Sequence, residues 1–228
     1  VVDVPDAAPI LAVLKQRGWN LTHVLLTHHH WDHVDGLPDV LAQFPKAQVI
    51  GAAADAHRLP PLTHHVAEGQ PFVFAGEPIE IFDVSGHTLD HIAYYFPDTA
   101  AVFTGDSLMA MGCGRLFEGS PAQMFDSLTK LAALPDKTTV CSGHEYTAGN
   151  CAFAASLGDN TEDVANRIAD TTHMRAQNIA TVPSNLGLEK RTNPFLRSAD
   201  PALQKALGMQ GAAPVDVFTE VRKQKDTF

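Results

Sequence analysis

The sequence predicts a mixed α/β protein, in which a main domain with two sheets is followed by a small all-helical domain. In the first 52 residues, strand-like apolar runs alternate with helical patterns, as in a sheet covered by helices. From residue 72, short strand-like segments are separated by turn residues. Beyond residue 159, apolar residues recur at helical spacing and no convincing strand remains. We therefore expect an α/β domain over 1–158 and an α-helical domain over 159–228.

The first part of the main domain is expected to alternate between strands and helices. In chain order, a strand, a helix, a strand, a helix and a strand are expected over 1–4, 5–18, 23–27, 37–44 and 47–52. In the first helix we expect Leu11, Val13 and Leu14 to face the core, and Gly18 ends the helix. In the second, apolar side chains repeat at helical spacing, at Leu37, Val40, Leu41 and Phe44.

The second part of the main domain is expected to consist of short strands and one helix. The strands are expected over 72–76, 79–86, 91–98, 100–106 and 138–143. The helix, over 121–134, carries Met124, Leu128 and Leu131 on one stripe, which we expect to pack in the core. The C-terminal domain is expected to contain a helix over 161–180 capped by Thr161, a loop over 185–198, and helices near 200–208 and 214–225.

The composition argues against several classes of partner. A net charge of −10 in 228 residues leaves no basic footprint for a nucleic acid. No apolar stretch approaches the roughly 20 residues that cross a membrane, so no membrane partner is expected. Three cysteines cannot all pair within the chain, which favours a reducing compartment, and we expect a cytoplasmic monomer. The chain begins without Met and in mid-strand, so we expect an N-terminal strand to be missing from this sequence.

Histidine and aspartate side chains gather where the predicted strands end. Four apolar strands run into turns that carry these residues, in VLLTHHHWDH, FDVSGHT, AVFTGDS and TVCSGHE. In folds of sheets and helices, ligands gather in the crevice beyond strand ends, so residues far apart in sequence converge there. The convergent set that we expect is His28, His30, Asp32, His33, His87, Asp106 and His144.

This set of seven favours a centre with two metal ions. A catalytic zinc takes about three protein ligands and one water, whereas two metals roughly 3.5–4 Å apart can share seven ligands if one carboxylate bridges. On an extended backbone the rings of His28 and His30 point the same way and His29 points away. Asp32 and His33 lie in the turn into the next helix and suit a second metal. Imidazole with carboxylate suits zinc, iron(II) or manganese and does not choose among them.

The remaining candidates have weaker contexts. A single His or Asp in a turn is more often a cap than a ligand. We therefore expect the isolated residues His87, Asp106 and His144 to be ligands only because the cluster at 28–33 needs partners. Cys113 and Cys141 lack a motif for activation and are expected to be small buried apolar residues. Six histidines are expected in ordinary surface or core positions, namely His23, His57, His64, His65, His91 and His173.

At these residues the sequence resembles the metallo-β-lactamase superfamily, whose signature H-x-H-x-D-H is matched by His28, His30, Asp32 and His33. Within it the chain is similar to glyoxalase II, the hydroxyacylglutathione hydrolases. The supporting stretches cover the whole chain and are LTHHHWDHVDG, SGHTLDHIAYYF, FTGDSL, GCGRLFEGSPAQMF, SGHEYT, NPFLR and VRKQKD. The resemblance implies an αββα metallo-β-lactamase-like sandwich with a small all-α C-terminal domain.

The resemblance also implies roles for the candidate residues. It implies two divalent metal ions, zinc foremost and iron or manganese as alternatives. The first would be held by His28, His30 and His87 and the second by Asp32, His33 and His144, with Asp106 as the bridge. The implied glutathione contacts are Arg115, Tyr146, Arg222 and Lys225, while Phe117 stands where relatives often have Tyr. Cationic side chains can bind the carboxylates of glutathione. The stretch VRKQK also fits a solvated helix C-terminus, where the helix dipole stabilises cations.

Together these implications predict hydrolysis of S-(2-hydroxyacyl)glutathione thioesters, with S-lactoylglutathione foremost, in methylglyoxal detoxification. Two cations would lower the pKa of a water molecule that attacks the thioester carbonyl, with Asp106 and Asp32 as catalytic carboxylates. Two alternatives stay open, a glutathione persulfide dioxygenase with a single iron and a non-catalytic metal-binding module. A β-lactamase is disfavoured because those enzymes commonly have Cys in place of Asp106, and a nuclease is disfavoured by the acidic charge.

Overall fold

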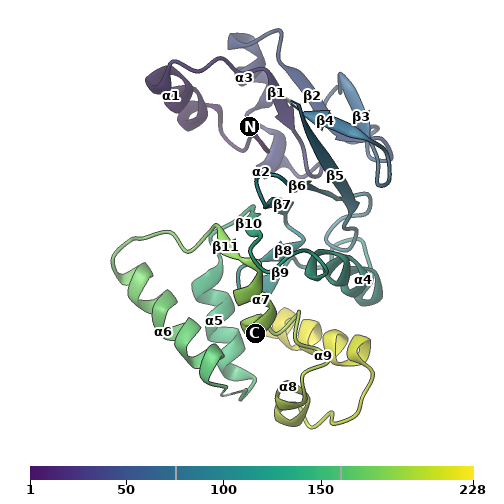
Figure 1. Cartoon of the computed structure of the whole chain (residues 1–228), viewed down its shortest axis with the longest axis vertical. Coiled ribbons are helices and arrows are strands. Elements are labelled where there is room, and N and C mark those ends of the chain that lie inside the picture. The colour runs from purple at the N-terminus through teal and green to yellow at the C-terminus, as the bar shows by residue number, and fades with distance from the viewer. Residues whose placement is uncertain (75, 160) are drawn as a thin grey trace.

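The structure is a computed structural model that describes residues 1–74, 76–159 and 161–228. In its first sheet, three parallel strands lie in the order β1-β2-β3 (Figure 1). These strands are β1 (His23–Leu25), β2 (Gln48–Ala52) and β3 (His64–Val66). The helices of this part of the chain are α1 (Ala7–Arg17), α2 (Trp31–Val34) and α3 (Leu37–Gln43).

The second sheet has six strands in the order β11-β10-β7-β6-β5-β4. Neighbours in this sheet pair antiparallel, except that β10 and β7 are parallel. The bounds are β4 (Phe72–Phe74), β5 (Glu77–Asp83), β6 (Ile92–Phe96), β7 (Ala101–Gly105), β10 (Thr139–Ser142) and β11 (Ser184–Asn185). A separate antiparallel hairpin is formed by β8 (Leu108–Met109) and β9 (Gly112–Cys113).

Helices make up most of the remaining chain. Their bounds are α4 (Pro121–Ala132), α5 (Thr147–Ser156), α6 (Glu162–Ala176), α7 (Leu186–Thr192), α8 (Pro201–Ala206) and α9 (Pro214–Thr227). In Figure 1, α5 to α9 gather at the end of the molecule opposite α1 and α3. Helix α4 begins at a capping box, in which Ser120 and Gln123 exchange side-chain and backbone hydrogen bonds. Within the described residues, no helix has both the length and the apolar character that crossing a bilayer requires.

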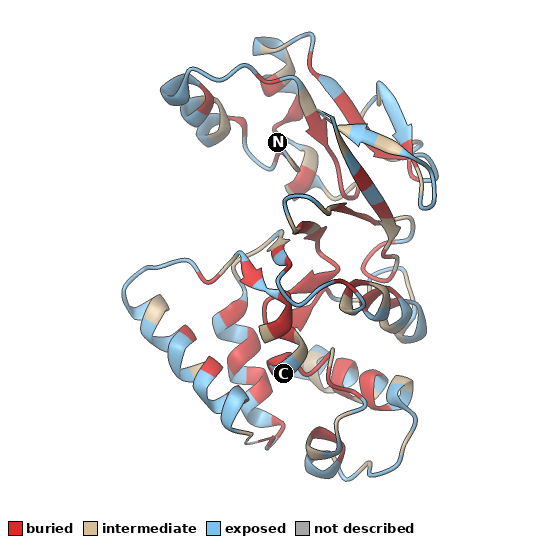
Figure 2. Ribbon diagram, in the orientation of Figure 1, coloured by how far each residue is buried: buried red, intermediate tan, exposed pale blue. Residues whose placement is uncertain are grey.

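Three apolar clusters show that the layers stack as helix, sheet, sheet and helix. One cluster packs α1 and α3 on the first sheet and includes Leu14. A second lies between the sheets, where Ile50 of β2 packs with Ile81 of β5. The third packs α4, α5 and α9 on the second sheet and includes Met124 and Phe153. Figure 2 shows the buried residues concentrated on the strands and on the inward sides of these helices, so the predicted αββα order is confirmed.

The structure corrects the expected elements of the first part of the chain. Residues 1–4 form only an isolated parallel bridge, between Val2 and Leu25, rather than a strand. Val13 is 48% exposed while Leu14 is buried, because neighbouring side chains lie about 100° apart on a helix and only one of them faces the sheet. Strand β3 and the hairpin β8–β9 were not expected, since two or three residues are too few to show an alternating pattern.

Further corrections concern the C-terminal part of the chain. The expected loop over 185–198 contains α7, whose first turn is capped by the Asn185 side chain. Strand β11 lies beyond residue 159, where no strand was expected, and pairs with β10. Thr161 is the N-cap residue of α6, but its side chain makes no capping hydrogen bond. Helix α5 was missed because its many small residues show no helical stripe.

Candidate metal centre

The turns that carry the predicted ligands meet in the structure. These residues lie directly after β1, between β5 and β6, after β7 and after β10. In the first ligand group, one nitrogen from each of His28, His30 and His87 lies within 4.8 Å of the others. In the second ligand group, the same holds for one atom from each of Asp32, His33 and His144. Asp32 and His33 lie in the short helix α2 itself, rather than in a turn before a helix.

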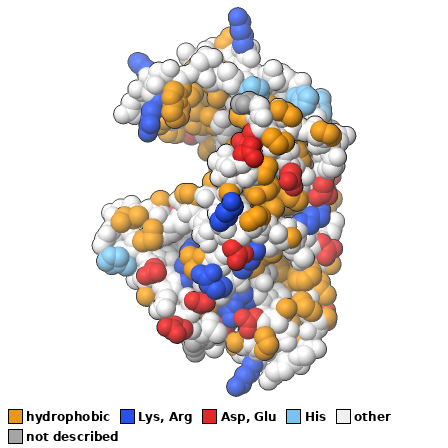
Figure 3. Space-filling model, in the orientation of Figure 1, with side chains coloured by type: hydrophobic (Ala, Val, Ile, Leu, Met, Phe, Trp, Pro, Cys, Tyr) orange, Lys and Arg blue, Asp and Glu red, His pale blue; other side chains and the backbone are white. Residues whose placement is uncertain are grey.

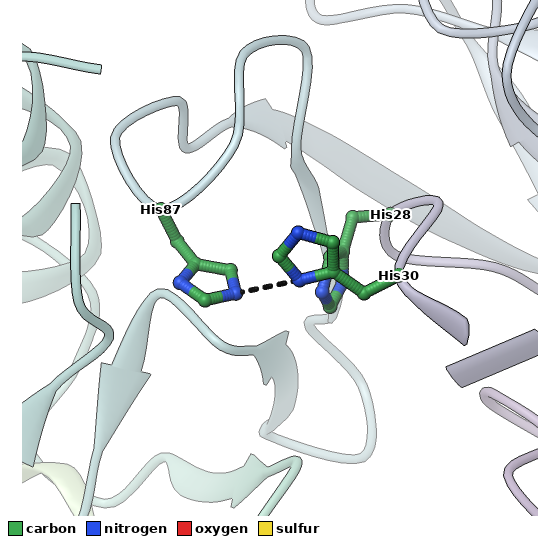
Figure 4. A group of neighbouring side chains, drawn as sticks. All are labelled: His28, His30 and His87. Carbon is green, nitrogen blue, oxygen red and sulfur yellow. Dashed lines mark hydrogen bonds between the residues drawn. The ribbon is translucent and has the colours of Figure 1, made fainter. Parts of the chain in front are cut away.

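Figure 4 shows how the first ligand group is assembled. The rings of His28 and His30 come from the segment after β1, and that of His87 comes from the turn between β5 and β6. His30 Nδ1 and His87 Nε2 are 3.0 Å apart, and the ring centroids of His28 and His30 are 4.8 Å apart. Three imidazoles that converge in this way form the kind of ligand set that catalytic zinc sites use.

The hydrogen bonds behind His28 leave its inward nitrogen free for a metal. The Thr27 hydroxyl donates to Asp3 at 2.8 Å, so it must accept from His28 Nδ1–H, which is 3.0 Å away. A proton on Nδ1 leaves a lone pair on Nε2. That Nε2 is buried and has no hydrogen-bond partner among the described residues. Because an unpaired buried polar atom is destabilising, a metal ion fits this position.

His33 and His87 are likewise oriented by a hydrogen bond from Nδ1 to an oxygen behind the ring. His33 Nδ1–H donates to the carboxylate of Asp3, and His87 Nδ1–H donates to the carbonyl of Arg115, each at 2.7 Å. Carboxylate and carbonyl oxygens only accept, so Nδ1 is the donor in both rings, and Nε2 is the nitrogen that faces the site and that a metal would bind once its proton is lost. Asp3 reaches this position with a φ of +52°, a left-handed conformation that is uncommon for residues other than glycine.

Asp106 lies between the two ligand groups. Its Oδ2 is 3.5 Å from His87 Nε2 and 3.3 Å from His144 Nε2, and its Oδ1 is 3.3 Å from His33 Nε2. Gly143 permits this approach, because a Cβ there would lie 2.5 Å from Asp106 Oδ1. Burial opposes the charge on Asp106, but hydrogen bonds from His144 and His33 prevail and hold its pKa well below the ordinary range. The site therefore contains a carboxylate that faces both groups.

The two ligand groups differ in their electrostatic surroundings. Burial lowers the pKa of every histidine in the first group, which favours neutral rings. In the second group, burial opposes charge on His33, but hydrogen bonds to Asp106 and Asp3 prevail and raise its pKa to about 10. A hydrogen bond to Asp106 also raises the pKa of His144. The acidic side chains that raise these pKa values would also attract a metal cation, which has to displace the protons in order to bind.

Sequence reasoning missed two residues that support the site. His91, expected to be an ordinary surface or core histidine, is fully buried, and its ring stacks on His28 with centroids 4.5 Å apart. Its Nε2 accepts the backbone N–H of Asp106 at 3.2 Å, and burial lowers its pKa to about 3. The position of His91, four residues after His87, was the available signal. Asp3 was missed because nothing in VVDV marks a link to a histidine thirty residues away.

A pocket of about 830 Å³ opens over the ligand groups. Tyr146 is 55% exposed there, and its ring stacks on His144 with centroids 4.8 Å apart. Phe117 is 63% exposed, with its ring centroid 5.7 Å from that of His30. The pocket lining thus includes ligands from both groups together with every predicted substrate contact, namely Arg115, Phe117, Tyr146, Arg222 and Lys225.

The three cations of this pocket differ in how firmly they are held. Arg222 is buried and donates to the carbonyls of residues 113–114 and to the Asp226 carboxylate. Arg115 is exposed and lies 3.6 Å from Asp226. Lys225 lies over two phenylalanine rings, 5.0 and 5.2 Å from their centroids. Figure 3 shows Lys and Arg side chains interspersed with Asp and Glu over the lower half of the face in view, so cations gather locally despite the net charge of −10.

Comparison with known proteins shows the class to which this fold and site belong. The family model for the metallo-beta-lactamase superfamily matches residues 3–144, and the model for the hydroxyacylglutathione hydrolase C-terminus matches residues 145–228. Together with the two ligand groups, this superfamily match identifies a site for divalent metal. The structure of TTHA1623 in a di-iron-bound form is similar at a TM-score of 0.63 and 26% identity, covering 86% of this chain and 88% of that one.

Curated relatives narrow the class to one family. The hydroxyacylglutathione hydrolase of Ruegeria pomeroyi is 59% identical over 228 residues, which cover 100% of this chain and 89% of that protein. The hydroxyacylglutathione hydrolase of Jannaschia sp. is 56% identical over 227 residues, which cover 100% of this chain and 88% of that protein. The chain belongs to the hydroxyacylglutathione hydrolase family, as its motifs predicted.

Proposed function

We propose that this chain hydrolyses S-(2-hydroxyacyl)glutathione thioesters, foremost S-lactoylglutathione, to a 2-hydroxy acid and glutathione. The observation that carries the proposal is a single pocket lined both by two groups of metal-capable side chains and by three cations. The similarity of the chain to hydroxyacylglutathione hydrolases that are 59% and 56% identical to it supports this substrate class. The chain is therefore a thioester hydrolase, and methylglyoxal detoxification is the process that it serves.

We assign one divalent metal ion to each ligand group. The donors of the first group are three imidazoles, and those of the second are two imidazoles and a carboxylate. Asp106 faces both groups and is assigned as the shared ligand. Zinc suits this mixture of nitrogen and oxygen donors best, with iron or manganese as alternatives. The di-iron-bound form of TTHA1623 supports the presence of two metals on this fold.

The residues of the pocket suggest how hydrolysis proceeds. When bound, the metal ions would supply Lewis acidity, which makes water more acidic and polarises a carbonyl. The Asp32 side chain is 33% exposed and lies 3.4 Å from His144, so its carboxylate is placed to accept a hydrogen bond from the attacking water and to orient it. The leaving group is a thiolate, which departs readily at neutral pH because a thiol pKa is about 8.5. A strong general acid is therefore not required.

The pocket cations are assigned to the glutathione part of the substrate. Arg115, Arg222 and Lys225 offer donors to its carboxylates, and Tyr146 offers a hydroxyl. Phe117 has no hydroxyl and is assigned an apolar contact beside the first ligand group. On this assignment residues 1–158 supply the metal centre, while 159–228 supply the two cations of α9. The three free cysteines fit a reducing compartment, and we keep the cytoplasmic monomer as part of the proposal.

The test is hydrolysis of S-lactoylglutathione by protein whose metal content is measured in the same sample. We expect turnover with close to two metals per chain. Absence of turnover, with about one iron per chain and oxygen consumption on glutathione persulfide, would replace the proposal with the dioxygenase. Absence of both reactions in a metal-loaded folded chain would leave a non-catalytic metal-binding module.

A further inference from the structure

One histidine of the cluster at 28–33 takes no part in either ligand group. His29 turns away from the pocket, and its Nδ1 lies 2.9 Å from Oδ2 of Asp55. Because an ionised carboxylate only accepts, His29 Nδ1 is the donor. The Asp55 side chain is fully buried, so this is a contact inside the protein. His29 therefore anchors the segment that carries His28 and His30 to a buried carboxylate.

The same carboxylate belongs to a network that reaches a second loop. Arg58 Nε donates to the other oxygen of Asp55, and Arg58 Nη1 lies 2.9 and 3.0 Å from the two carboxylate oxygens of Glu118. Arg58 donates to the carbonyl of Leu89 at 3.0 Å, and Glu118 accepts the N–H of Leu89 at 2.8 Å. Leu89 is two residues from His87, so the turn that carries His87 is tied to the same charged cluster.

The backbone around Glu118 adds a further tie to that turn. The N–H of Phe117 donates to the carbonyl of His87 at 3.1 Å, and the N–H of Gly119 donates to the carbonyl of Gly86 at 3.1 Å. The network thus joins the segments 27–33, 85–91 and 114–119. Among the described residues, none of its hydrogen bonds reaches a side chain of the second ligand group.

The charges explain why this network holds a fixed geometry. A fully buried carboxylate is destabilising unless it is paired, and Asp55 has both His29 and Arg58 as donors. The backbone N–H of Leu89 and the guanidinium of Arg58 outweigh the effect of burial and lower the pKa of Glu118, so Glu118 stays ionised. We therefore expect removal of His29 to leave Asp55 with Arg58 as its remaining side-chain donor and to loosen the segment that carries His30.

We propose that His29 is a positioning residue, which acts with Asp55, Arg58 and Glu118 to set the spacing of His30 and His87 and thereby the metal affinity of the first ligand group. His29 does not line the pocket, so on this proposal it would contact neither metal nor substrate. The inference rests on the proposed metal centre, and it assigns the network to one of the two groups. Partners that orient metal ligands typically contribute 10–100-fold to metal affinity.

The test is competition for zinc between a chelator and the metal-free folded protein, with the unaltered chain compared with His29→Ala and His29→Asn. Two zinc ions are expected on the unaltered chain. In His29→Ala we expect one of them to bind about 10–100-fold more weakly and the other to stay within about twofold. In His29→Asn the amide places a donor near the original Nδ1, so we expect most of the affinity to return. Glu118→Gln, at a less buried position, is expected to lower the affinity for the same zinc ion by a few-fold.

Lys130→Met is a matched control, because it removes a different ion pair, Lys130–Glu68, whose side chains are 40% and 41% exposed. It is expected to leave both zinc ions unaffected. The inference would be overturned if His29→Ala lowered the affinity for both zinc ions equally, or lowered neither affinity. Zinc binding and hydrolysis are scored separately. If the unaltered chain hydrolyses no thioester but His29→Ala loses one zinc ion, the proposed function fails and this inference stands.

Discussion

The two ligand groups share one pocket but are held in different ways. The first consists of three imidazoles whose pKa values are lowered by burial, and a charged network anchors its loops from outside. The second contains a carboxylate, and acidic neighbours raise the pKa of its two histidines. We therefore propose that metal affinity would depend mainly on geometry in the first group and mainly on negative charge in the second.

The largest effect is expected where the two groups meet. Asp106→Asn removes the carboxylate charge that faces both, so we expect kcat/KM for the thioester to fall by about 10³-fold, the upper range for losing one electrostatic group at an active site. Steady-state kinetics on metal-quantified protein checks this. Asp126→Asn, at an exposed position of α4, should leave the kinetics unchanged. Near-normal turnover in Asp106→Asn would show that neither group depends on it.

A smaller effect is expected from the residue behind the second group. Asp3→Asn weakens the acceptor that fixes the His33 ring, so zinc affinity of the second group should fall about 10–100-fold. The first group should change less, because the hydrogen bond of its His28 runs to the Thr27 hydroxyl rather than to Asp3 itself. Chelator competition measures both affinities. Asp39→Asn, at an exposed position of α3, serves as the control, and an equal loss in both groups would contradict the contrast.

The pocket cations lie outside both groups and should alter binding alone. Lys225→Met removes one charged donor, worth roughly 1.5 kcal/mol, so we expect KM to rise about tenfold with kcat within about twofold. Lys223→Met tests the same change on an exposed position of the same helix and should have no effect. A fall in kcat with KM unchanged would place Lys225 in the chemical step instead.

The mildest test concerns pH and the stability of the metal-free chain. His33 has a pKa raised to about 10 from an ordinary value of 6.5, so its stabilising contribution is complete below about pH 6.5 and is lost as pH rises through about 10. The histidines of the first group have lowered pKa values, so they destabilise the fold as pH falls below about 6.5. Urea unfolding across this range should show both trends. His33→Asn should remove much of the alkaline loss, and an unchanged alkaline slope in that variant would refute the assignment.

Much of the fold followed from periodicity, and the exceptions have physical reasons. The stripe of Met124, Leu128 and Leu131 is buried as predicted, because a long amphipathic helix has one stable way to lie on a sheet. Helix α7 was mistaken for a loop, since its stability comes from tertiary contacts such as those of the fully buried Glu189. Cys113 is buried with its pKa raised to about 11, in agreement with an unreactive thiol.

The site was predictable where chemistry is local and missed where it is not. The spacing of His28, His30 and His33 predicts a metal site, because few other roles need so many imidazoles beside a strand end. Asp3 is the hydrogen-bond partner of His33, and Asp55 is the partner of the neighbouring His29; both aspartates lie far from these histidines in the sequence, and only the fold shows the contacts. Contacts between residues so far apart produce no recognisable spacing pattern in the sequence.

On the proposed function, both ligand groups, each with its own metal, are needed for thioester hydrolysis. The most direct measurement is titration of the metal-free chain with zinc while S-lactoylglutathione hydrolysis is followed in the same cuvette. We expect little turnover after the first equivalent of zinc and a rise in turnover that saturates at the second. Full activity at one equivalent, or none after two have bound, would contradict it.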